Sequence, residues 1–117
     1  MTKTLIYIAL MYVVSLNLLG QVESGTVVGT VTDQAGAVVP GALVTIVNEG
    51  TRLTRSVTTS GNGQYVVDSF PTGRISLTVE HAGFERLVRT GVVLTAADTV
   101  TVNLQLSVGN VQQTVEV

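Results

Sequence analysis

The chain has 117 residues, a formal net charge of −2 at pH 7 and a hydrophobic fraction of 45%, which indicate one folded domain rather than a disordered segment. It contains no cysteine, so disulfides, thiolate metal sites and thiol nucleophiles are excluded. Its six lysine and arginine residues are scattered singly, so no basic patch could follow a phosphate backbone, and nucleic acid is not expected as a partner.

The N-terminus has the pattern of a signal peptide. Lys3 supplies a positive charge, and an unbroken apolar run follows over residues 5–14. A membrane-spanning helix needs about 20 predominantly apolar residues, and polar residues interrupt this stretch before that length. We therefore predict a helical signal peptide over residues 1–20, cleaved after Gly20, and an exported protein. Cleavage after Ser24 and retention as an uncleaved signal anchor are the alternatives.

Short runs rich in valine, isoleucine, leucine and threonine follow, separated by turn residues about every ten positions. The clearest alternation places Ile75, Leu77 and Val79 on one face of a strand, with polar residues on the other. A weaker last strand is suggested near the C-terminus by isolated valines. The expected strands cover residues 26–32, 42–48, 53–59, 65–67, 75–80, 86–93 and 100–106.

The spacing of these runs predicts an all-β fold. No segment after the signal peptide has a helical period of 3.6, and alternating strands with one polar face are typical of antiparallel sheets. Two such sheets packed face to face would bury the apolar set. We therefore expect an antiparallel β-sandwich of seven or eight strands.

Four short sequence motifs together resemble the carboxypeptidase regulatory-like domain. The opening is GTVTDQAGAVVPGALV over residues 29–44, and GQY (63–65), FPTG (70–73) and AGF (82–84) follow in the family's order. The likeness extends over about residues 25–106. It implies a prealbumin-like, that is transthyretin-like, sandwich related to carbohydrate-binding folds.

This resemblance also implies a domain organisation and a setting. Residues 21–107 would form the sandwich, and residues 108–117 a C-terminal strand or the start of a linker. With its signal peptide, the chain is most similar to the N-terminal extension of TonB-dependent outer-membrane receptors. The implied protein is an exported, non-catalytic accessory module of the periplasm or outer membrane, acting as a spacer or protein-binding domain. Its partner would be a protein or an adjoining receptor domain, and it would meet the membrane only through the signal peptide or a downstream barrel.

The alternative is a free secreted module that binds a carbohydrate or a peptide. Sugar-binding platforms present aromatic rings to solvent, and Tyr65, Phe70 and Phe84 are the aromatic residues that follow the signal peptide. They are the candidate ligand contacts, although Tyr65 and Phe70 also lie where a core would need an aromatic ring.

Catalytic, metal and cofactor sites are not expected. His81 is the only histidine, and one imidazole cannot make a zinc site without further ligands. It is also the only imidazole base for a nucleophilic serine, and the sequence has no Gly-x-Ser-x-Gly motif. The acidic residues fall in separate turns, whereas calcium needs 6–8 converging oxygen atoms. The Gly61-Asn62-Gly63 segment lacks the lysine and helix of a phosphate loop and is typical of a hairpin. We therefore predict that the chain is not an enzyme.

Overall fold

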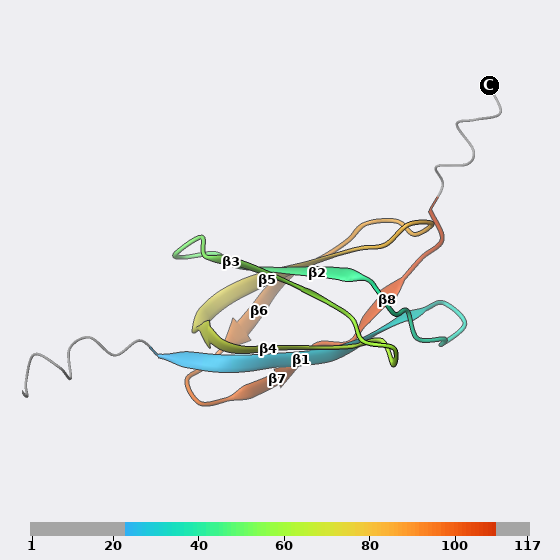
Figure 1. The fold of residues 1–117 in the computed structure, drawn as a ribbon. Coiled ribbons are helices and arrows are strands. Elements are labelled where there is room, and N and C mark those ends of the chain that lie inside the picture. Colours follow the sequence, from blue (N-terminus) through green and yellow to red (C-terminus); the bar gives the residue numbers. More distant parts are fainter. Residues whose placement is uncertain (1–22, 110–117) are drawn as a thin grey trace, which may run out of the picture.

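The computed structural model describes residues 23–109, which form eight β-strands and no helix (Figure 1). The predicted all-β sandwich is confirmed. The predicted signal peptide and most of the segment 108–117 lie outside the described residues. The strands are β1 (Ser24–Asp33), β2 (Leu43–Asn48), β3 (Thr54–Thr58), β4 (Gln64–Pro71), β5 (Gly73–Glu80), β6 (Leu87–Leu94), β7 (Thr99–Thr101) and β8 (Leu104–Leu106).

Two four-stranded sheets form the two layers. One has the order β4-β1-β7, with β8 also paired to β1, and the other has the order β3-β2-β5-β6. The inward faces of both sheets meet in one apolar core, in which Ile75, Leu77 and Val79 are fully buried as the alternation predicts. Burial of such side chains supplies the main favourable term for a small sandwich.

The sheet that contains β1 is not wholly antiparallel, which corrects one detail of the expected fold. β7 pairs in parallel with residues 26–28 of β1, and β8 pairs in parallel with residues 31–33. Since β1 is the first strand and β8 the last, the described chain begins at one end of the sandwich and leaves after β8 at the other (Figure 1).

The expected strand 100–106 is divided into β7 and β8 by a local irregularity. Val102 still donates its backbone N–H to Val28 O at 2.8 Å. Next along the chain, the side-chain Oδ1 of Asn103 accepts the backbone N–H of Thr30 at 3.0 Å. A side chain therefore takes the place of a backbone carbonyl at this point, and the regular ladder resumes at Leu104.

Gly29 permits the close approach of three strands at this irregularity. The hydroxyl of Tyr65, on β4, donates to Val102 O at 2.6 Å and passes directly beside Gly29. A Cβ at position 29 would lie 1.8 Å from Val102 O, so no side chain fits there. Gly29 is therefore required by packing rather than by a turn.

A buried asparagine joins two turns. Asn48 donates through Nδ2 to the carbonyls of Pro71 and Thr72, and its Oδ1 accepts the backbone N–H groups of Gly50 and Thr51, each at 3.0 Å. All four hydrogen-bonding positions of the amide are used, so its burial leaves no polar group unsatisfied. The turn after β2 and the turn after β4 are thereby held together.

Candidate functional site

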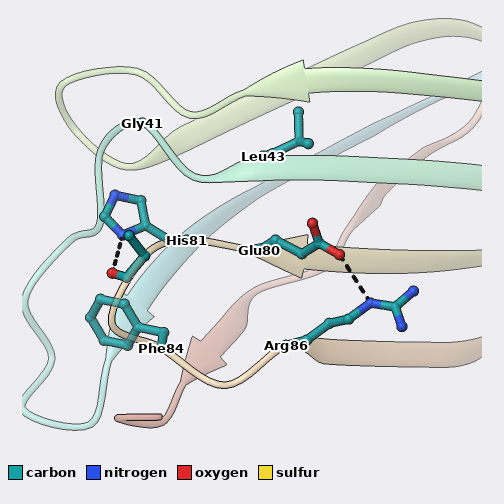
Figure 2. A pocket seen from close by; sticks show the side chains of 7 residues that line it. Gly41, Leu43, Glu80, His81, Phe84 and Arg86 are labelled. Atoms are coloured by element: carbon teal, nitrogen blue, oxygen red, sulfur yellow. Dashed lines mark hydrogen bonds and ion pairs between the residues drawn. The ribbon is translucent and has the colours of Figure 1, made fainter. Parts of the chain in front are cut away.

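A groove of about 510 Å³ lies between the start of β2 and the turn that joins β5 to β6 (Figure 2). We call it the end groove. β2 contributes Leu43 as its first residue, and β5 contributes Glu80 as its last. The turn between β5 and β6 supplies most of the remaining wall, and Gly41 comes from the turn before β2. The lining residues are Gly41, Leu43, Glu80, His81, Ala82, Phe84 and Arg86.

An ion pair provides the charge in the end groove. Arg86 Nε lies 3.1 Å from Glu80 Oε1, and the two side chains are 65% and 55% exposed. An exposed pair of this kind contributes at most about 1 kcal/mol to stability. The second carboxylate oxygen of Glu80 remains a hydrogen-bond acceptor, and the other N–H groups of the Arg86 guanidinium remain donors. The pair therefore offers an acceptor and donors side by side and carries no net charge.

His81 and Phe84 form the wall of the end groove away from the Glu80–Arg86 ion pair (Figure 2). Their rings meet edge to face, with centroids 5.7 Å apart at an interplanar angle of 66°. His81 Nδ1 lies 3.0 Å from Ala82 O, which favours the tautomer that carries its proton on Nδ1 and leaves Nε2 as an acceptor. Gly83, at φ +89°, allows the tight turn between them.

The turn is fixed from behind by the segment that follows β8. Glu85 N donates to Ser107 O at 2.8 Å, and Gly109 N donates to Gly83 O at 2.9 Å. Phe84 is thus held between the end groove and the segment through which the described chain leaves the sandwich. Contacts between positions more than 20 residues apart create this wall, so local sequence patterns give no signal for it.

The three predicted ligand contacts differ in their burial. Tyr65 is 2% exposed, and burial raises the pKa of its hydroxyl above its usual range, with the positive charge of Arg89 acting in the opposite direction. Phe70 is 0% exposed, with the guanidinium of Arg55 5.5 Å from its ring centroid. Both side chains are buried in the core and present almost no surface to solvent. Phe84, half-buried, lines the end groove.

The titratable side chains of the described chain do not converge. Within residues 23–109 there is no group of three or more His, Cys, Asp or Glu residues that could hold a metal ion. His81 has one carboxylate neighbour in the end groove, that of Glu80, which is paired with Arg86. Over the same residues, no helix is long and apolar enough to cross a membrane.

The family model of the carboxypeptidase regulatory-like domain matches residues 26–107, from within β1 to just after β8. The chain belongs to this family. The match confirms the resemblance of the four sequence motifs, and it includes every lining residue of the end groove. The end groove is therefore part of the regulatory-like domain itself. A comparison with the curated proteins gave no match.

Solved structures share the fold of this regulatory-like domain at low sequence identity. The Bacillus anthracis TIE protein has a TM-score of 0.63 and 22% identity, over 74% of this chain and 17% of that one. Catechol 1,2-dioxygenase from Acinetobacter radioresistens has a TM-score of 0.62 and 15% identity, over 76% and 53%. The dioxygenase from Pseudomonas arvilla C-1 gives 0.62 and 12%, over 78% and 55%.

These likenesses show the sandwich alone. The chain spans about one sixth of the TIE protein and about half of each dioxygenase. The same fold thus occurs inside larger proteins of different kinds, and function has to be argued from the residues of this chain.

Proposed function

We propose that the domain is an exported, non-catalytic module of the cell envelope that acts as a spacer or protein-binding domain. Its setting would be the periplasm or outer membrane, as the N-terminal part of a TonB-dependent outer-membrane receptor. Its partner would be a protein or an adjoining receptor domain. The signal-peptide pattern over residues 1–20 and the family membership support this setting.

The placement of the first and last strands is the observation that carries the spacer role. β1 has ten residues, and at about 3.3 Å per residue it spans roughly 33 Å. Because β8 runs parallel to the far end of β1, the described chain leaves about that distance from where it begins. The chain leaves at this end because β8 pairs with residues 31–33, the last three residues of β1. A domain with this topology separates whatever precedes it from whatever follows it.

The arrangement of polar groups supports a non-catalytic role. A general base needs a nucleophile or acidic partner within hydrogen-bond reach. The described His81 contacts the carbonyl of Ala82 and the ring of Phe84. The hydroxyls of Thr59 and Tyr65 are committed to backbone carbonyls in the core.

Export is tested by expressing the 117-residue chain in a Gram-negative host. Mass spectrometry of the protein from the envelope fraction should give an N-terminus between residues 21 and 25. The variant Leu10→Arg, which places a charge in the apolar run, should remain in the cytoplasm, whereas Ala9→Leu should be exported normally. Wild-type protein that keeps Met1 in the envelope fraction would contradict the cleavage.

Spacing is tested by pulsed electron resonance between two spin labels. The chain has no cysteine, so Glu23→Cys and Val108→Cys create the only labelling sites, and both native side chains are exposed. The distance should be about 30 Å or more, from the rise of β1. A distance near that of adjacent strands would refute the spacer topology.

A second function is favoured by the end groove, namely binding of a peptide or glycan. The neutral Glu80–Arg86 pair offers both an acceptor and donors beside the apolar surfaces of Phe84 and Leu43. Such a mixture of one ring and a few polar groups is typical of ligand sites. On glycan and peptide arrays, a wild-type signal should disappear with Phe84→Ala and persist with Val88→Ala. Arrays without any wild-type signal would remove this function.

A further inference from the structure

We propose that the domain bears tensile load along the chain, and that the parallel β1–β7 and β1–β8 pairings are its mechanical clamp. The proposal rests on the spacer role, because a spacer is loaded through the two ends of its chain. It assigns to the described sandwich a property, resistance to stretching, that goes beyond keeping two segments apart.

The direction of the strands determines how a pulling force acts. Tension at Glu23 draws β1 backwards along its own axis, and tension at Gly109 draws β8 forwards. Because β1 and β8 are parallel, the two forces slide the strands past each other in opposite directions (Figure 1). All hydrogen bonds between them are then strained at the same time, and unfolding requires that they break together.

The clamp extends over most of β1. Residues 26–28 pair with β7, and residues 31–33 pair with β8. The gap between the two patches is bridged by Val102 N to Val28 O at 2.8 Å and by Thr30 N to Asn103 Oδ1 at 3.0 Å. The two short strands therefore act on β1 as one continuous ladder.

The buried side of the clamp excludes water from the sliding surface. Val27 and Val31 of β1 and Leu104 and Leu106 of β8 are at most 1% exposed. Sliding by one residue would place polar side chains of these strands in the core, since neighbouring residues point to opposite faces. Tyr65 adds a tie from β4 to Val102 O at the centre of the clamp.

The pairing of β1 with β4 provides the opposite case in the same molecule. These strands are antiparallel, and Thr72 N lies 3.4 Å from Glu23 O at the open end of the pair. A force applied between residues 23 and 72 pulls the two strands apart sideways. Their hydrogen bonds then break one pair after another, starting from that end.

Single-molecule force spectroscopy on the cysteine-free chain tests the clamp. Handles are attached to Glu23→Cys with Val108→Cys in one protein, and to Glu23→Cys with Thr72→Cys in a second. At the same loading rate, the first pair should need a several-fold higher unfolding force, although both proteins should have the same melting temperature. Equal forces, or a lower force for the first pair, would overturn the proposal.

Two further variants locate the resistance. Asn103→Ala removes the acceptor that bridges the two patches, while the exposed Thr30 N–H can still bond to water. It should lower the unfolding force between residues 23 and 108 and leave the force between residues 23 and 72 unchanged. Asn62→Ala, in the turn before β4, should change neither force. If Asn103→Ala and Asn62→Ala behave alike, the bridge is not part of the clamp as proposed.

The force measurement and the tests of the proposed function can fail independently. A high force in purified protein that is not exported would support the clamp and refute the envelope setting. A low force in an exported protein with widely separated labels would refute the clamp and leave the spacer role intact.

Discussion

Asn48 and the Glu80–Arg86 pair are both polar groups at strand ends, but they are held in different ways. The Asn48 amide is buried and makes four hydrogen bonds within the protein. The ion pair is more than half exposed and has hydrogen-bonding positions left over. A polar group that the protein satisfies completely stabilises the fold, whereas one that water completes can exchange that water for a ligand. Substitutions in the interior and in the end groove should therefore separate stability from binding.

Among substitutions in the interior, Leu77→Ala should have the largest effect on the free energy of unfolding. Leu77 is fully buried in the core, and its truncation should lower the free energy of unfolding by about 2–5 kcal/mol. Chemical denaturation measures this cost, with Thr78→Ala on the outer face of the same strand as the control. A cost near zero would show that β5 has a register one residue away from the one described.

Gly29→Ala should cost about 3 kcal/mol, because its Cβ would overlap Val102 O and force β1 away from the segment between β7 and β8. Gly61→Ala is the matched control, since a Cβ at position 61 has no atom within 4 Å. The two glycines should therefore differ clearly in denaturation midpoint. Similar midpoints would mean that the three-strand approach at Gly29 is looser than described.

Tyr65→Phe should cost about 1–2 kcal/mol, because it leaves Val102 O buried without its hydrogen bond. The raised pKa of Tyr65 adds a pH dependence. The folded state favours the neutral phenol, so this contribution is complete below the unfolded pKa of about 10 and is lost as the pH rises above that value. The wild-type protein should thus lose more stability than Tyr65→Phe in alkaline titrations. Parallel losses would indicate that Tyr65 is accessible to water.

Arg86→Ala should have the smallest effect, within about 0.5 kcal/mol, because its ion pair is exposed. Arg55→Ala is the informative control, since Arg55 covers Phe70 and donates to Asp68 O at 2.7 Å. In thermal melts, Arg55→Ala should therefore have a lower melting temperature than Arg86→Ala. The reverse order would assign a structural role to the end groove.

Local patterns were sufficient to predict the sandwich and its inward faces. The alternation through Ile75, Leu77 and Val79 reports burial directly, because neighbouring residues of a strand point to opposite faces. The parallel pairing of β7 and β8 could not be predicted in this way, since strand direction depends on partners about 70 residues away. The division at Asn103 follows from the same cause, because it depends on the N–H of Thr30 in β1.

The candidate site was predicted only in part. The sequence predicts Phe84 as a candidate ligand contact, and the structure places it in the end groove. Tyr65 and Phe70 could not be distinguished from it by residue type, because an aromatic ring serves a core and a binding surface equally well. The pairing of Glu80 with Arg86 requires β5 and β6 to be neighbours, which the topology rather than the local sequence determines.

Arg55 has a consequence for solubility at high protein concentration. It lies on β3, an outer strand of one sheet. Its guanidinium donates a hydrogen bond to the backbone carbonyl of Asp68 on β4, an outer strand of the other sheet. Free strand edges invite pairing with further chains and thereby aggregation, and an inward-pointing charge on an outer strand opposes this pairing. On the opposite side of that sheet, Gly91 at φ +76° interrupts the regularity of β6, close to a register shift in its pairing with β5. Both outer strands of this sheet are therefore poor templates for the growth of a longer one.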